Sequence, residues 1–331
     1  MKKSTVCALV CLLLTLTCPT QAWARELSLG GQAVGIRIRT EGVLVAGLSQ
    51  VEGGTESRCP AEEAGLAVGD RIIAVDGRSI ESVGELVAAV EESAGAPVRL
   101  TLQRQEERLE KELCPVRSGE GQWMLGLWLQ DGISGIGTLT FCDPATGIYG
   151  ALGHGVSGEE SREPLPLRSG EITDAEILGV NKGAAGAPGE LNGCVDEGQV
   201  LGSVELNGSG GIYGHAFSAL GGRTVETGQP CPGPATVLST VSGREAREYH
   251  VEITRVFRDS NGCHVMLTVT DPALRELTGG IVQGMSGSPI LQEGKLVAAV
   301  THVYLSDPCR GYGLSIQDML NQAGLNEEQA A

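Results

Sequence analysis

The sequence is poor in aromatic residues and in positive charge, and both shortages exclude kinds of partner. Aromatic residues make up 3% of the 331 positions, so few rings are available to stack on exposed bases. Lysine and arginine together number 24 against 41 acidic residues, which gives a formal net charge of −17. Nucleic acid and anionic membrane surfaces repel a chain of this charge. We therefore expect no nucleic-acid partner.

Closely spaced cysteine pairs are also missing. None of the ten cysteines forms a Cys-x-x-Cys pair, so a zinc cluster is not expected, and nothing else in the sequence calls for a metal or an organic cofactor. Seven cysteines follow residue 18, an odd number, and the sequence leaves the pairing of any disulfides open.

Long apolar runs are absent except at the N-terminus. A short apolar run from Val6 to Cys18 follows Met1-Lys2-Lys3, and Ala22-Trp23-Ala24 fits a small-x-small cleavage site. This pattern predicts an export signal over residues 1–24 and an extracytoplasmic protein. The run is short for a membrane span, but an uncleaved anchor that tethers the chain stays open.

Glycine and β-branched residues dominate what remains, and they favour short strands over long helices. Between residues 30 and 117 the spacing of apolar residues predicts one helix, Ser82 to Ser93, among several strands. The expected strands are Gln32 to Arg39, Gly42 to Leu48, Arg71 to Gly77, Val98 to Arg104 and Arg108 to Val116.

Four short motifs in this region carry a resemblance. They are Pro60-Ala61, Ala64-Gly65-Leu66, Val68-Gly69-Asp70-Arg71-Ile72 and Val75-Asp76-Gly77. Together they resemble the core signature of a bacterial PDZ domain, an α/β fold, here over residues 30–117. The resemblance implies that an extended peptide ligand is bound by strand addition. It places the peptide between a loop with Val34, Gly35 and Ile36 and a helix wall with Val83 and Val87.

Residues 118–331 have a different pattern. A polar, glycine-rich connector, Ser118 to Gln122, precedes repeated short apolar segments separated by turns. This pattern indicates an all-β barrel or sandwich, closed by a helix over Ile316 to Ala323. The strands are expected at residues 123–130, 137–142, 147–152, 172–180, 199–206, 236–241, 249–256 and 265–269.

The segment Gly284-Met285-Ser286-Gly287-Ser288-Pro289 lies between two apolar, β-branched segments. Glycines on both sides allow a sharp turn that exposes Ser286, and the amides of Gly284 and Ser286 could then form an oxyanion hole. The pattern resembles the nucleophile loop of chymotrypsin-like serine peptidases.

A serine nucleophile needs a base and a group that orients the base. His154 is preferred among the five histidines because it follows an apolar strand and has a glycine on each side. His215 is a rival, and His302 could be a neighbour of the site. The preferred acid is Asp271, which ends an apolar strand shortly before the serine loop. Asp174 is the runner-up.

The order of these features resembles the stage IV sporulation protein B peptidase family. The features are the export signal, the PDZ motifs, GALGHGVS around His154, Thr270-Asp271-Pro272, GGIVQGMSGSPI around Ser286, and then AVTHV and GYGLSI. The resemblance implies a chymotrypsin-like double β-barrel with Ser286 as nucleophile, His154 as base and Asp271 as acid. It also implies a serine endopeptidase that cleaves a membrane-protein partner between the mother cell and forespore membranes, in sporulation signalling.

Two other functions remain open at this point. One is a quality-control protease with the same chemistry, although such proteases usually carry PDZ domains after the catalytic domain. The other is a PDZ adaptor without catalytic activity, which the presence of Ser286, His154 and an acid disfavours.

Overall fold

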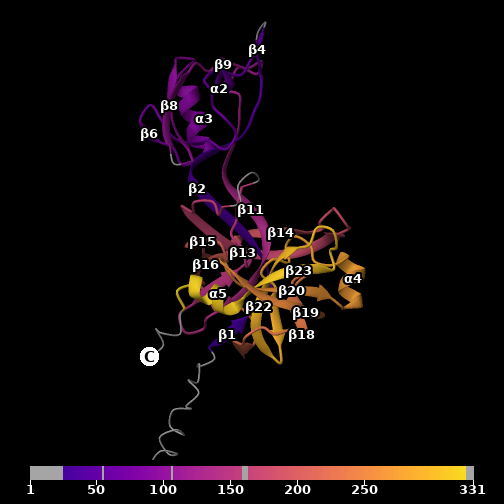
Figure 1. The fold of residues 1–331 in the computed structure, drawn as a ribbon. Helices are drawn as coiled ribbons and strands as arrows, with labels where there is room; N and C mark the ends of the chain where they lie inside the picture. Colours follow the sequence, from indigo (N-terminus) through magenta and orange to yellow (C-terminus); the bar gives the residue numbers. More distant parts are fainter. Residues whose placement is uncertain (1–24, 54–55, 106, 159–162, 326–331) are drawn as a thin grey trace, which may run out of the picture.

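The computed structural model describes residues 25–53, 56–105, 107–158 and 163–325. The predicted export signal at residues 1–24 lies outside them. Figure 1 shows two bodies joined by a pair of long strands. Within the described part of the chain, no helix is both long enough and apolar enough to cross a membrane.

The two long strands are β2 (Ala33–Leu48) and β11 (Leu127–Cys142), which we call the ribbon. They are antiparallel, with Leu127 opposite Leu48 at one end and Thr138 opposite Ala33 at the other. For each of these two long strands, the sequence analysis predicted two shorter ones. Pairing along nearly the whole length, interrupted by bulges, holds each of them as one strand.

The smaller body, which we call the PDZ body, has one apolar core. Leu86 and Val90 of helix α3 pack in this core with Leu100 of β7 and Val45 of the ribbon. Its other elements are β3 (Val51–Gly53), β4 (Glu56–Arg58), α2 (Pro60–Glu63), β5 (Arg71–Val75), β6 (Arg78–Ser79), α3 (Val83–Glu92), β7 (Val98–Arg104), β8 (Glu107–Leu113), β9 (Val116–Arg117) and β10 (Trp123–Met124).

The PDZ core does not coincide with residues 30–117. It takes in Leu125, Leu127 and Leu129 from beyond that range. Val34, Ile36 and Ile38 pack in another core, with Leu139 and Tyr149 of the larger body. The start of β2 therefore belongs structurally to the larger body, and the PDZ core extends from Val43 to Leu129.

The larger body, which we call the barrel body, contains a closed barrel in the order β18-β19-β20-β23-β22-β21. Beside the barrel lies a large sheet that the ribbon continues into the PDZ body (Figure 1). The elements outside the ribbon are β1 (Glu26–Leu29), β12 (Ile148–Ala151), β13 (Ser169–Asn181), β14 (Glu190–Ser203), β15 (Leu206–Gly208), β16 (Gly211–His215), β17 (Thr224–Glu226), β18 (Gly233–Ser239), β19 (Arg247–Asp259), β20 (Gly262–Val269), α4 (Pro272–Thr278), β21 (Pro289–Gln292), β22 (Lys295–Val303), β23 (Arg310–Ser315) and α5 (Ile316–Gln322).

The barrel body confirms the mainly β prediction and the closing helix. Helix α4 was not expected, because its sequence is short and follows a strand directly. Seven cysteines lie in the described part of the chain, and all seven are free thiols there.

Candidate active site

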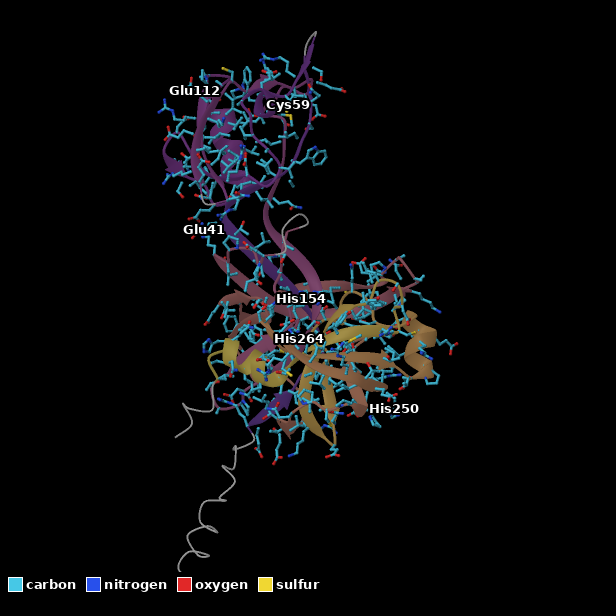
Figure 2. The ribbon with its side chains drawn as sticks, viewed as in Figure 1. Glu41, Cys59, Glu112, His154, His250 and His264 are labelled. Carbon is cyan, nitrogen blue, oxygen red and sulfur yellow. The ribbon has the colours of Figure 1, made fainter. Side chains whose placement is uncertain are left out.

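Ser286, His154 and His302 line one cavity of about 560 Å³ where the ribbon meets the barrel. Figure 2 shows His154 at the lower end of the ribbon, and His250 well apart from it. Apart from the two histidines, the described residues that line the cavity carry no ionisable side chain. No group of three histidine, cysteine or acidic side chains that could hold a metal ion occurs anywhere in the described residues.

The loop that carries Ser286 is shaped by two glycines with positive φ angles, 96° at Gly284 and 94° at Gly287. A Cβ atom at Gly287 would collide with the carbonyl oxygen of Thr138. Thr138, on β11, holds the loop through two hydrogen bonds. Its amide donates to the Ser286 carbonyl at 3.0 Å, and its hydroxyl donates to the Gly284 carbonyl at 2.8 Å.

The backbone amides of this loop divide into two groups. Those of Met285, Gly287 and Ser288 donate to backbone carbonyls at 2.8–3.1 Å. Those of Gly284 and Ser286 donate to no acceptor among the described residues. Free amides at these two positions are what an oxyanion hole requires, because its donors must be available to the developing charge.

The Ser286 hydroxyl donates to the carbonyl oxygen of Thr301 on β22, at 2.8 Å. No hydrogen bond joins it to either histidine of the cavity in the described structure. The hydroxyl must therefore turn away from Thr301 before a histidine can take its proton.

His154 follows β12 in a tight loop with positive φ angles at Leu152 (71°) and Gly153 (69°). A Cβ atom at Gly153 would be 3.1 Å from the Val300 carbonyl oxygen, so glycine lets the loop approach β22 closely. The Nδ1 of His154 is 2.9 Å from the Gly155 carbonyl oxygen. Because a carbonyl only accepts, Nδ1 carries the hydrogen, and Nε2 is free to accept a proton. Burial lowers the pKa of His154, so its ring is neutral at pH 7.

His302 lies against His154, with the ring centroids 4.8 Å apart. Burial by its surroundings and the neighbouring His154 lower the pKa of His302 to about 4, although part of its side chain stays exposed at the cavity rim. From the sequence, His302 was expected only as a neighbour of the site. The sequence feature that could have placed it in the site is its position in the strand that follows the serine loop.

The structure does not bring Asp271 to His154. Asp271 is the N-cap of α4, and its carboxylate accepts from the amides of Ala273, Leu274 and His250. Its pKa is lowered because these donors outweigh the effect of burial. The Thr-Asp-Pro motif here has the signature of a helix start, an N-cap residue followed by proline.

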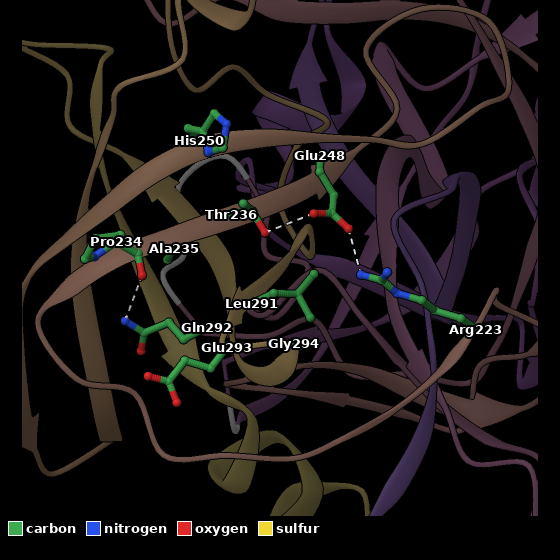
Figure 3. A pocket seen from close by; sticks show the side chains of 10 residues that line it. All are labelled: Arg223, Pro234, Ala235, Thr236, Glu248, His250, Leu291, Gln292, Glu293 and Gly294. Atoms are coloured by element: carbon green, nitrogen blue, oxygen red, sulfur yellow. Dashed lines mark hydrogen bonds and ion pairs between the residues drawn. The ribbon is translucent and has the colours of Figure 1, made fainter.

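The runner-up acid is engaged elsewhere as well, since Asp174 forms an ion pair with Arg244. Of the other histidines, His215 pairs with Glu205, and His264 contacts Asp259. His250 lines a separate hollow beside the Arg223–Glu248 ion pair, which Figure 3 shows without any residue of the serine loop.

The predicted peptide-accepting loop is wrong in its position. Val34, Gly35 and Ile36 lie in the middle of a sheet, where β2 pairs with β11 on one edge and with β13 on the other. Strand addition needs a free edge, so these residues cannot accept a peptide. Val83 and Val87 do lie on helix α3 of the PDZ body, and Val87 is 49% exposed. They remain candidates for a helix wall.

Comparison with known proteins gives two family matches. The model described as "SpoIVB peptidase S55" matches residues 121–320, and a PDZ-domain model matches residues 56–104. Among solved structures, the inactive form of the Rv3671c protease of M. tuberculosis H37Rv has 12% identity and a TM-score of 0.34, over 59% of this chain and 83% of that one. Its active form has 13% identity and a TM-score of 0.35, over 58% and 74%. These distant similarities carry no argument here.

The family match covers both histidines, the serine loop and every described residue that lines the cavity except Ile36. The match to a serine peptidase family agrees with two features of the cavity, the free amides of the serine loop and the neutral His154. The chain is a serine peptidase with a PDZ domain, and it belongs to the SpoIVB peptidase S55 family.

Proposed function

We propose that this peptidase is an endopeptidase that acts outside the cytosol on a membrane-protein partner and thereby triggers a step of sporulation signalling. The observation that carries the chemistry is the placement of Ser286 and His154 on one cavity beside two free amides. The resemblance of the sequence to its family supports the biological setting. The export pattern of residues 1–24 supports a place between the mother cell and forespore membranes, with or without tethering.

The reaction follows from the positions of these groups. The Ser286 hydroxyl turns from Thr301 to Nε2 of His154, gives up its proton and attacks the scissile carbonyl carbon. The amides of Gly284 and Ser286 donate to the resulting oxyanion. His154 then protonates the leaving amine, and water releases the acyl group by the same steps in reverse order.

The lining of the cavity supports a substrate segment rich in aliphatic residues. Ile133 and Ile136 come from the ribbon, while Ile281, Val282 and Val303 come from the barrel. Charged substrate side chains would lose hydration here without gaining a partner.

The first test is labelling of residues 25–331 with a fluorophosphonate probe, which reacts with activated serines. We expect the wild type to be labelled and the Ser286→Ala and His154→Ala variants to lose labelling by several orders of magnitude. Ser260→Ala, the same change in an exposed turn, is the matched control. A folded wild type without labelling would contradict the proposal and favour an adaptor.

A second test separates a dedicated peptidase from a quality-control protease. The enzyme is offered casein and the extracytoplasmic tail of a membrane-protein partner, with and without the PDZ body. Deleting residues 30–117 would remove buried strands of the barrel body. The proper excision replaces residues 40–131 with Asn-Gly, because Arg39 and Gly132 are cross-strand neighbours that a tight turn can join. We expect this excision to change substrate choice, and rapid degradation of casein by both forms would favour quality control.

A further inference from the structure

A carboxylate would ordinarily orient the base of the catalytic cavity. No aspartate or glutamate is among the described residues that line it. Asp271 is bound to helix amides, and Asp174 is bound to Arg244. What lies beside His154 instead is the ring of His302.

His154 has one hydrogen bond in this structure, from Nδ1 to the Gly155 carbonyl. A single hydrogen bond fixes the tautomer, but it leaves the ring free to pivot about that bond. The His302 ring lies 4.8 Å away, centroid to centroid, with its plane tilted by 34°. This separation is within the range of stacked aromatic pairs, so the contact restricts the pivot.

Strand β22 contacts both the nucleophile and the base through neighbouring residues. Thr301, the residue before His302, accepts the hydrogen bond of the Ser286 hydroxyl at 2.8 Å. The strand pairs with β21 as far as Ala299. It pairs with β23 at Val300 and at Val303, on either side of an irregularity that contains Thr301 and His302. Two adjacent residues of one strand therefore contact the nucleophile and the base.

We propose that His302 is a positioning residue of the peptidase reaction, whose ring holds the His154 imidazole with Nε2 turned toward Ser286. The inference rests on the proposed roles of Ser286 and His154. His302 orients the base through ring contact, as a triad carboxylate would through a hydrogen bond, without exchanging a proton with the substrate.

The charge state of His302 fits this role. Besides burial, the ionisable groups that lower the pKa of His302 are His154 across the ring contact and His264 from β20. A positive charge on His302 would oppose the imidazolium that forms on His154 during attack. A neutral ring avoids this repulsion and still shields His154 from water.

The test compares His302→Ala with His302→Phe, which keeps a ring but has no nitrogen, in the full chain. The substrate is a quenched fluorescent peptide with aliphatic residues on both sides of the scissile bond. We expect His302→Ala to lower kcat by ~10²-fold with little change in KM, the size typical of a misplaced general base. His302→Phe should recover most of this loss. The matched control is His250→Ala, which removes an exposed strand histidine outside the cavity.

The pH profile separates positioning from a general structural effect. Opening the site to water in His302→Ala should raise the pKa of His154, so the acid limb of kcat/KM moves up toward pH 6.5, whereas in His302→Phe it should stay low. The same comparison of the His154 pKa can be made by NMR titration in the inactive Ser286→Ala background. This measurement tests the inference even if the wild type proves not to cleave peptides.

Three results would overturn the inference. His302→Ala could match the wild type in kcat and in its pH profile. His302→Phe could be as impaired as His302→Ala, which would mean that a nitrogen of His302 is required. His302→Ala could abolish fluorophosphonate labelling while His154→Ala retained it, which would make His302 the base. Loss of wild-type labelling, in contrast, contradicts the proposed function and leaves the NMR comparison to decide the role of His302.

Discussion

The two bodies differ in how closely other elements surround their glycine turns. In the PDZ body, the turn Asp76-Gly77 is stabilised by a hydrogen bond from the Arg99 amide to the Asp76 carboxylate at 2.9 Å. A Cβ atom at Gly77 would meet nothing within 4 Å. In the barrel body, the loop of Ser286 is enclosed by β11 and β22, and a Cβ atom at Gly287 would collide with the Thr138 carbonyl oxygen. The same chemical change should therefore have different consequences in the two bodies.

The largest contrast is expected between Gly287→Ala and Gly77→Ala. Both glycines have positive φ angles, 94° and 79°. At Gly77 the cost is the strained backbone alone, ~1–2 kcal/mol of the free energy of unfolding. At Gly287 the new Cβ also meets the Thr138 carbonyl, so we expect a loss of about 3 kcal/mol or more. Urea unfolding measures both, and fluorophosphonate labelling should disappear in Gly287→Ala alone. Equal losses in the two variants would contradict the contrast.

A second pair tests the hydroxyl groups of two buried threonines, Thr138→Val and Thr101→Val. Thr138 loses its hydrogen bond to the Gly284 carbonyl, which costs about 1 kcal/mol of stability. Because Gly284 then shifts, the labelling rate should fall roughly tenfold. Thr101 lies in the PDZ body, and its substitution should leave the labelling rate unchanged. A slower rate in Thr101→Val would show that the PDZ core affects the serine loop directly.

A smaller effect is expected for Asp271→Asn. Asparagine is as good an N-cap as aspartate, so α4 should persist and stability should change by less than about 1 kcal/mol. The structure leads us to expect peptidase activity within roughly tenfold of the wild type, whereas loss of a triad acid costs about 10⁴-fold in kcat. Comparing kcat for Asp271→Asn with that for Asp271→Ala distinguishes the two roles of Asp271. Asparagine keeps the helix cap and removes the carboxylate, whereas alanine removes both.

The smallest effect is a dependence of stability on pH. His154 and His302 have lowered pKa values in the folded chain, so the unfolded chain binds protons more readily as the pH falls below 6.5. Stability is therefore full above pH 6.5 and declines toward pH 4, the pKa of His302. Asp70 and Asp143, whose pKa values are lowered by Arg104 and by Thr146 and Arg25, act in a separate window below about pH 3.8. Urea midpoints between pH 7.5 and 4.5 should decline less in His302→Phe.

How far the sequence predicted this molecule depends on the range of the contacts involved. The strand Val98–Arg104 and the helix at residues 83–92 were predicted closely, because apolar periodicity is a local signal. The shared cavity of Ser286 and His154 was anticipated from glycine-flanked motifs. The separation of Asp271 from His154 was not, since it depends on which strands pair. Asp271 illustrates the limit, because the same Asp-Pro step suits a catalytic acid and a helix cap.

The ribbon also has a mechanical consequence. One strand, β11, packs against the PDZ core at Leu127 and Leu129 and forms hydrogen bonds with the serine loop at Thr138. An extended strand of this length, roughly 33 Å from Trp128 to Thr138 at ~3.3 Å per residue, can tilt but cannot shorten. It connects the two bodies directly, as a paired strand interrupted only by two irregularities near its PDZ end. A tilt of the PDZ body at one end would thus move the oxyanion donors at the other.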